Sequence, residues 1–216
     1  MESRGFARGL CWQKLFWVLV AGSVFGVAWE HCVNLLMHGR FYGGRGLVWG
    51  PFNLVYGCGA VLLTLLLWPL RDGQAHKLLL AGMLAGSAYE VGCSLLQETV
   101  FGAVSWNYDR ELLPLLGGRT TLPVAFAWGL LAVFYMKAVY PRLSRLIERI
   151  PPRLGRALTL ALLVFLAVDA LVSLLAVGRM AARRAALPAQ GGLDLLMDLC
   201  FPDHALKEIF PGMKFI

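Results

Sequence analysis

Long apolar segments alternate with short polar ones along almost the whole chain. Five apolar segments stand out, over about residues 15–36, 53–70, 76–97, 120–140 and 157–178. Each has roughly the 17–25 residues that an α-helix needs to cross a hydrocarbon core about 30 Å thick. The segments are too long for barrel strands and lack their alternation of apolar and polar positions. We therefore predict an all-α fold: a polytopic membrane helical bundle of about five transmembrane helices.

The composition supports this class of protein. Of the 216 residues, 58% are hydrophobic and 15% are charged, and the mean hydropathy is +0.65. Soluble domains have about 25% charged residues, so this chain has too few to cover a soluble surface. We expect one membrane domain over residues 1–182 and a short tail, residues 183–216, that is too polar to span. Residues 1–30 resemble a signal peptide, but the apolar segment continues past its small residues, so we expect no cleavage.

An internal duplication is visible at an offset of sixty residues. Residues 21–36 and 81–96 are identical at seven of sixteen aligned positions. Beyond these helices, Gly-Gly-Arg occurs at 43–45 and again at 117–119, each time followed by Pro and then by an aromatic residue and Gly. A two-helix unit returns the chain to its starting side of the membrane, so the two copies must be parallel. We predict a parallel two-helix internal repeat over about residues 15–70 and 76–140.

Small and polar residues recur at every fourth position in the first helix of each repeat, which places them on one helix face. They are Gly22, Gly26, Glu30, Asn34 and His38 in the first copy, and Gly82, Gly86, Glu90, Ser94 and Glu98 in the second. Glycines four residues apart permit close helix contact, and lipid cannot solvate the polar half of such a face. We therefore expect the first and third helices to face each other, with Glu30 near Glu90.

These two carboxylates have two interpretations. They could only hold helices together, with Glu30 paired to Arg119 and Glu90 to Arg45, or each to the arginine of its own repeat. They could instead line a polar chamber for a substrate or ion. A charge within a membrane helix costs about 2.5–3.5 kcal/mol on insertion scales, so two at matched positions suggest a reason to keep them.

Asp169 lies in the middle of the fifth apolar segment. It could accept a hydrogen bond from Ser173, four residues on, or from a neighbouring helix, and this interpretation is slightly favoured over a proton or cation relay.

The segment after the third helix is rich in glycine and aromatic residues. Trp106 and Tyr108 could anchor at the membrane interface, whereas Asp109 and its charged neighbours could cap an outer cavity. We expect this segment to be ordered and irregular, which is tolerated at membrane depth where it is buried in protein or lines water.

Basic residues set the expected orientation. An N-terminus in the cytoplasm places eleven Lys and Arg residues on that side and nine on the other, which favours this orientation in the cell membrane. Residues 142–156 are expected to form one basic interfacial helix on anionic lipid, or a docking surface for a cytoplasmic partner.

Several function classes lack their signatures. There is no basic patch with interleaved aromatic residues, so no nucleic acid is expected. The four histidines and five cysteines lack metal-ligand spacing, and there is no phosphate-binding GxxxxGK[ST] loop, hydrolase motif or dinucleotide fingerprint. We expect no metal and no cofactor, and an enzyme is the less favoured class.

Short motifs along the chain resemble a known family. They include Gly50–Pro51, Tyr56–Gly57–Cys58–Gly59, Leu96–Gln97–Glu98, Trp106–Asn107–Tyr108, Gly118–Arg119, Trp128–Gly129 and Phe210–Pro211–Gly212. Together they resemble the putative ABC-transporter type IV family, a bacterial multi-pass membrane group described as permease-like. The resemblance runs from about residue 20 to the C-terminus and implies a role in transport.

We therefore expect a permease-like transporter subunit with a polar pathway at the repeat interface and no ATPase of its own. Its partners would be the bilayer, a separate ATP-binding subunit docking at residues 142–156, and further copies of the chain. One alternative is a membrane enzyme acting on a phosphate-bearing lipid, with Glu30, Glu90 and Asp169 as acids or bases and Arg45 and Arg119 holding the phosphate. The other is a structural or regulatory scaffold.

Overall fold

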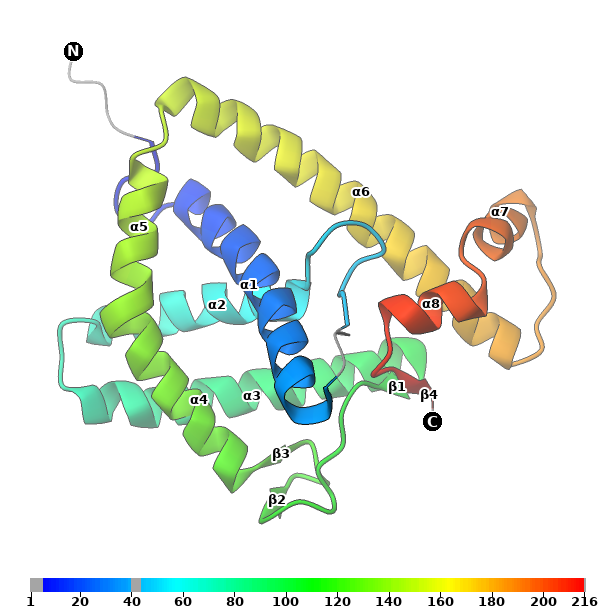
Figure 1. The fold of residues 1–216 in the computed structure, drawn as a ribbon, viewed down its shortest axis with the longest axis horizontal. Helices are drawn as coiled ribbons and strands as arrows, with labels where there is room; N and C mark the ends of the chain where they lie inside the picture. Colours follow the sequence, from blue (N-terminus) through cyan, green and yellow to red (C-terminus); the bar gives the residue numbers. More distant parts are fainter. Residues whose placement is uncertain (1–5, 40–43, 216) are drawn as a thin grey trace.

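The computed structural model describes residues 6–39 and 44–215, and almost all of its regular structure is helical (Figure 1). The long helices are α1 (Trp12–His38), α2 (Leu54–Leu67), α3 (Ala75–Phe101), α4 (Leu122–Phe134), α5 (Tyr140–Glu148) and α6 (Pro152–Arg184). A 3-10 turn, η1 (Trp68–Leu70), extends α2, and a π-helix, η2 (Tyr135–Val139), joins α4 to α5. The tail contains α7 (Gly192–Cys200) and α8 (Asp203–Ile209). The strands are two-residue pairs: β1 (Ala103–Val104) with β4 (Lys214–Phe215), and β2 (Pro114–Leu115) with β3 (Thr120–Thr121).

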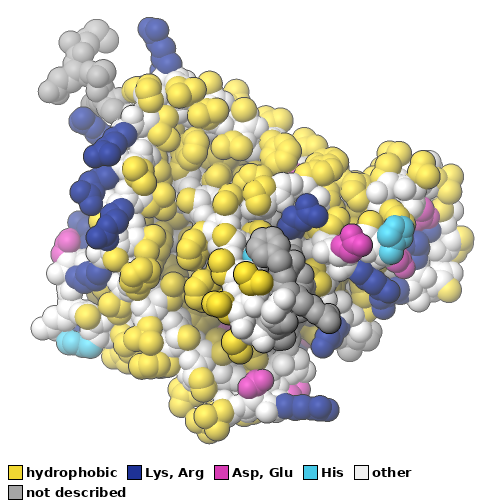
Figure 2. All heavy atoms as spheres, in the orientation of Figure 1, with side chains coloured by type: hydrophobic (Ala, Val, Ile, Leu, Met, Phe, Trp, Pro, Cys, Tyr) yellow, Lys and Arg dark blue, Asp and Glu magenta, His cyan; other side chains and the backbone are white. Residues whose placement is uncertain are grey.

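Within the described residues, four helices are long and apolar enough to cross a membrane: residues 12–37, 75–101, 122–148 and 152–184. The apolar helix formed by α2 and η1, residues 54–70, is shorter. Large apolar side chains such as Leu36 (84% exposed) and Leu84 (75% exposed) face outward, and apolar atoms cover most of the face shown in Figure 2. A soluble surface of this kind would aggregate, whereas lipid tails solvate it. The prediction of an all-α, multi-pass membrane bundle is confirmed.

The duplication appears as two helix pairs with the same packing. In the first pair, a Cβ built on Gly22 would lie 2.8 Å from Ala60 Cβ, and one built on Gly26 would lie within the ring of Tyr56. In the second, Gly82 meets Ala132 and Gly86 meets Trp128 in the same way. The small residues therefore let α1 approach α2, and α3 approach α4, with no side chain between the backbones.

This packing contradicts the expectation that the first and third helices face each other. The glycine face of α1 lies on α2 and the glycine face of α3 lies on α4. It is α2 that packs along α3. The glycine stripes therefore hold together the two helices of each repeat. The contact between the repeats is the one between α2 and α3.

The segment after the fourth helix also differs from its prediction. Residues 140–148 continue α4 through the π-helix, and α6 begins at Pro152, so residues 142–156 are not one interfacial helix. Ile147 is buried in the core, with Leu143 and Ile150 packed against it. The apolar side of α5 thus faces protein, because α5 packs against the start of α1, and its arginines remain outside (Figure 2).

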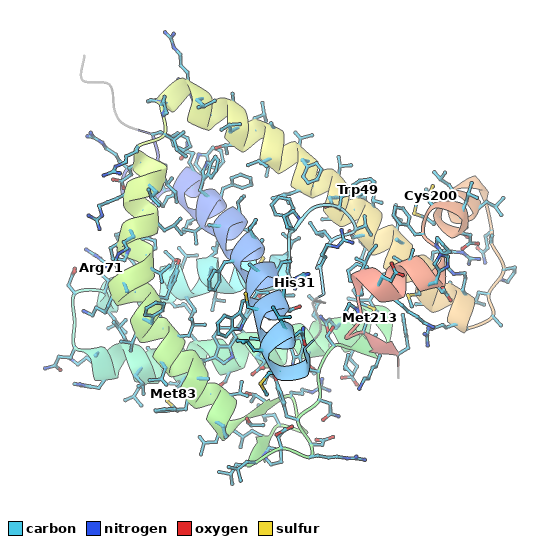
Figure 3. The ribbon with its side chains drawn as sticks, in the orientation of Figure 1. His31, Trp49, Arg71, Met83, Cys200 and Met213 are labelled. Atoms are coloured by element: carbon cyan, nitrogen blue, oxygen red, sulfur yellow. The ribbon has the colours of Figure 1, made fainter. Side chains whose placement is uncertain are left out.

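Residues 44–53, here called the strap, connect α1 to α2 and lie against the middle of α6. Leu47 and Val48 are buried, and Trp49 lies beside α6 (Figure 3). The Val48 N–H donates to Ser173 Oγ (2.9 Å) and the Trp49 N–H donates to Asp169 Oδ1 (3.2 Å). Non-helical backbone at membrane depth needs such partners, because lipid offers none.

The two ends of the strap are also fixed by backbone hydrogen bonds. The Arg45 N–H donates to the carbonyl of Ile209 in α8 (3.0 Å), and the Asn53 N–H donates to the carbonyl of Ser23 in α1 (3.2 Å). Asn53 then caps α2 by accepting the Val55 N–H on its side chain (3.1 Å). The strap therefore links α1, α2, α6 and the tail.

Asp169 is fully buried and accepts a second hydrogen bond from Ser173 Oγ at 3.4 Å. The favoured sequence interpretation named this Ser173 contact, and the structure adds the backbone of Trp49. Asp169 Oδ2 has no hydrogen-bond partner among the described residues. The carboxyl group therefore acts mainly as the acceptor that holds the strap.

The tail folds back on the end of α6 through two arginines. Arg179 Nε lies 2.9 Å from Asp198 Oδ1 in α7, and Arg183 pairs with both Asp198 and Asp203. Hydrogen bonds from Arg179 and Arg183 hold the pKa of Asp198 below its usual range. The antiparallel β1–β4 pair then joins the C-terminal end to the segment after α3.

We predict that Gly86→Ala destabilises the α3–α4 pair. The new Cβ would overlap the ring of Trp128, and overpacking of this kind costs about 1–3 kcal/mol. The measurement is the apparent melting temperature of the purified protein in detergent. Gly92→Ala, in the same helix but with nothing within 4 Å of the new Cβ, is the matched control and should melt at or above the wild-type temperature. Equal melting of both variants would contradict the prediction.

We predict that Asp169→Leu releases the strap, whereas Asp169→Asn largely retains it. Leucine leaves the Trp49 N–H without its acceptor, at a cost of about 1–3 kcal/mol for a buried donor, and asparagine keeps one oxygen. Hydrogen exchange of residues 46–50 should rise in the leucine variant and stay near the wild-type rate in the asparagine variant. Protection unchanged by leucine would show that Asp169 does not hold this segment.

Candidate functional site

Glu30 is held on the polar face of α1 by contacts from its own repeat. Its Oε1 accepts a hydrogen bond from the hydroxyl of Tyr56 in α2 at 2.8 Å. The backbone of Gly44, at the start of the strap, also hydrogen-bonds to the carboxylate. The residue is half-buried. The close approach at Gly26 is what brings the Tyr56 ring over α1 and its hydroxyl to Glu30.

Glu90 occupies the equivalent place on α3 and is more deeply buried, at 8% exposed. Its Oε1 accepts the hydroxyl of Tyr108, from the segment after α3, at 3.2 Å. Thr120 and Trp128 lie beside the carboxylate, but neither Glu90 Oε2 nor Thr120 Oγ1 has a partner with ordinary hydrogen-bond geometry in the described residues. Glu90 therefore keeps one carboxyl oxygen unsatisfied.

A tyrosine hydroxyl donates to each of the two carboxylates. Tyr56 and Tyr108 come from different repeats, and the charge of one is felt at the other. Burial, together with the neighbouring Glu90, raises the pKa of Tyr108 above its usual range. The phenol therefore stays protonated and donates to its carboxylate. We call Glu30, Tyr56, Tyr108 and Glu90 the acidic cluster.

Neither carboxylate of the acidic cluster forms an ion pair within the described residues, so the pairings of Glu30 and Glu90 with Arg119 or Arg45 are wrong. Arg119 is half-buried and pairs with Glu98, and it also donates to Ser94 Oγ at 2.9 Å. Glu98 lies two turns of α3 beyond Glu90, and it is Glu98, not Glu90, that binds Arg119. Arg45 is exposed. Its described contact is the hydrogen bond that its backbone N–H donates to the carbonyl of Ile209 in α8. Asn34 is half-buried on α1, beyond Glu30.

The segment between α3 and α4 is ordered around the second arginine. The Trp106 indole donates to the carbonyl of Arg119 (3.2 Å), and the Tyr108 N–H donates to the carbonyl of Gly118 (2.8 Å). Asp109 is exposed and forms a local turn with Asn107, whose side chain accepts the Asp109 N–H (2.7 Å). Trp106 and Tyr108 therefore face protein, and Tyr108 is the residue of this segment that reaches the acidic cluster.

Asp169 belongs to a different set of contacts, on α6 with the strap. Sequence reasoning grouped it with the two glutamates as a polar core residue, but its described hydrogen bonds are to Trp49 and Ser173. Sequence reasoning also missed Tyr56 as a functional side chain. The signal was present, because Tyr56 and Trp128 are the aromatic residues of the repeated Pro–aromatic–Gly motif.

The chemistry of the acidic cluster is that of a proton or cation acceptor. Two carboxyl groups in membrane helices that make no ion pair with Lys or Arg in the described residues can remain there as neutral acids or by binding a cation. His31 lies close enough to Glu30 to interact with its charge. In the part of the chain that the structure describes, no group of three or more His, Cys, Asp or Glu side chains suits a metal ion. The hydroxyls of Tyr56 and Tyr108 fix the orientation of the carboxyl groups.

Comparison with models of protein families gives a match. A family model described as "Putative ABC-transporter type IV" matches residues 17–174. The matched region begins in α1 and ends in α6, so it includes both helix pairs, the strap, Asp169 and the acidic cluster. No curated protein and no solved structure matches the chain. Because the match covers well over half of the sequence, this chain belongs to the putative ABC-transporter type IV family, a family of transporter-like multi-pass membrane proteins.

Proposed function

We propose that the protein is the permease-like subunit of a membrane transporter, with its polar pathway at the acidic cluster. The observation that carries the proposal is the pair of carboxyl groups, one from each repeat, that make no ion pair with Lys or Arg among the described residues and that each accept a tyrosine hydroxyl. Acidic side chains that only hold helices together would be more stable in ion pairs, such as the one that Glu98 makes with Arg119. A site that binds a proton, a cation or a cationic substrate must leave its acids unpaired.

The membrane domain of this subunit comprises residues 1–182 in the proposal, and residues 183–216 form a tail attached to its outer end. The N-terminus lies in the cytoplasm of the cell, because the end of the bundle that holds the N-terminus and α5 carries eleven Lys and Arg residues against nine at the other end. The acidic cluster then lies in the outer half of the membrane.

Energy for transport would come from a separate ATP-binding subunit, since the sequence has no phosphate-binding loop for ATP. The exposed arginines of α5, Arg142 and Arg145, form the docking surface in this proposal. They lie at the cytoplasmic end and outside the core that Ile147 enters. An enzyme that holds a phosphate with Arg45 and Arg119 is less well supported, because Arg119 is engaged by Glu98 and Arg45 points to solvent or lipid.

We predict that dicyclohexylcarbodiimide, an apolar reagent for protonated carboxyl groups, labels Glu90 in membranes near neutral pH. An unpaired acid in a membrane helix is protonated, whereas an acid paired with arginine stays ionised and reacts poorly. Mass spectrometry of the digested protein locates the adduct. Glu90→Gln should remove most of the labelling of α3, and Glu98→Gln, the control for the arginine-paired acid, should leave it unchanged. Labelling confined to Glu98 would refute the assignment.

We also predict that the tagged chain, purified from its native membranes in mild detergent, carries an ATP-hydrolysing partner. Arg142→Ala with Arg145→Ala should lower the co-purified, vanadate-sensitive ATP hydrolysis about tenfold or more, as expected when contacts worth about 1.4 kcal/mol are lost. Arg110→Ala, at an exposed arginine of the opposite end, is the control. A wild-type preparation without ATP hydrolysis would count against the transporter assignment.

A further inference from the structure

A cavity of about 520 Å³ lies at the end of the bundle where α2 meets α5, away from the acidic cluster. Trp68 and Arg71 line it from the turn after α2, and Lys137, Tyr140 and Ser144 line it from the π-helix and α5. Figure 3 shows Arg71 beside the helix that α4 and α5 form. This volume is within the range of small-molecule sites, and the proposed transport pathway does not use it.

Arg71 is held in a fixed position in this cavity. Its guanidinium lies 4.1 Å from the centre of the Trp68 ring, and its Nη1 donates to the Trp68 carbonyl at 3.0 Å. Asp72 Oδ2 lies 3.2 Å from its Nε, but Asp72 is 84% exposed and is screened by solvent. A guanidinium has five N–H donors, so Arg71 still has donors at Nη2 for a ligand.

Lys137 is placed beside Arg71 by the π-helix. Its Nζ donates to the carbonyls of Arg71 and Gly73, both at 2.8 Å. An ammonium group has three donors, so one remains. Widened π segments within α-helices occur frequently at functional sites. Here the π-helix is where α4 passes into α5, and it carries the lysine over the turn that holds Arg71.

Tyr140 supplies the second, independent observation. The residue is only 5% exposed and lines the cavity, but its hydroxyl has no hydrogen-bond partner in the described part of the chain. Ser144 lies beside this hydroxyl, but the two groups do not have ordinary hydrogen-bond geometry, and the Ser144 hydroxyl is already bonded to Lys14 and Glu148. An unsatisfied buried hydroxyl costs about 1–3 kcal/mol. The hydroxyl oxygen is enclosed by protein, so a bound acceptor recovers this cost when the wall beside Tyr140 opens toward the cavity.

We propose that this cavity binds the phosphate group of an anionic molecule. The remaining donors of Arg71, Lys137 and Tyr140 are a guanidinium, an ammonium and a phenol, which together suit the several acceptor oxygens of a phosphate. The group could belong to an anionic phospholipid of the adjacent leaflet or to a soluble phosphate ester. The inference is independent of the transport function and of the acidic cluster.

The test uses the full chain, purified in detergent and stripped of lipid. Native mass spectrometry measures the binding of phosphatidylglycerol, and a separate titration uses sn-glycerol 3-phosphate without lipid. The double variant Arg71→Gln/Lys137→Gln should weaken binding about tenfold or more. Arg153→Gln/Arg156→Gln, which removes two arginines at the same end of the bundle but outside the cavity, should bind as the wild type does.

Tyr140→Phe removes only the unpartnered hydroxyl and should weaken binding about threefold without lowering the apparent melting temperature. Binding of phosphatidylglycerol alone supports a lipid site, and binding of both probes supports a site that also accepts soluble phosphate esters. Absence of binding by either probe, equal weakening by the two double variants, or unchanged binding by Tyr140→Phe would overturn the proposal.

Discussion

The middle of the strap can lie against the centre of α6 because Ser173 and Asp169 accept the N–H groups of Val48 and Trp49. A hydrocarbon core offers a peptide group no alternative partner, so an irregular segment must bring its own acceptors or stay outside. Here the acceptors lie on α6, and the segment they hold also reaches α1 and α8. The start of α2, and with it Tyr56, takes its position from this contact. The acidic cluster thus depends on a carboxyl group that is not a member of it.

The two repeats share their packing but have diverged in their polar chemistry. Each places an aromatic ring against a glycine of its first helix, Tyr56 on Gly26 and Trp128 on Gly86. In the first copy this ring supplies the hydroxyl for its glutamate. In the second copy Tyr108, from the connecting segment, supplies the hydroxyl. The two repeats therefore hold equivalent carboxyl positions, and each carboxyl group has its own tyrosine donor.

Much of the fold could be predicted from the sequence, because membrane helices need long apolar segments and place small and polar residues at regular spacing. The apolar segments, the glycine stripes and the matched glutamates all follow from helix geometry. The Asp169–Ser173 contact within one helix could be predicted, but the partners of polar side chains on other elements could not, since they depend on which helices meet. The stripe that includes Glu90 gave no indication that Arg119 would bond Ser94 and Glu98 instead. The π-helix was missed as well, because one extra residue per turn leaves no compositional mark at Tyr135–Val139.

The apolar helix of α2 and η1 has only 17 residues, whereas its neighbours α1 and α3 have 27 each. At about 1.5 Å per residue it covers roughly 25 Å, less than a hydrocarbon core of about 30 Å. On the side of the bundle that faces α6, the strap covers the remaining length of the hydrocarbon core beside this short helix. On the side that faces α3, the open apolar groove lined by Leu62, Leu66 and Gly92 has no such supplement. A helix shorter than the hydrocarbon core is accommodated by thinning of the bilayer, by its flanking residues or by neighbouring protein, so lipid beside this groove meets a shorter apolar surface than lipid beside α1.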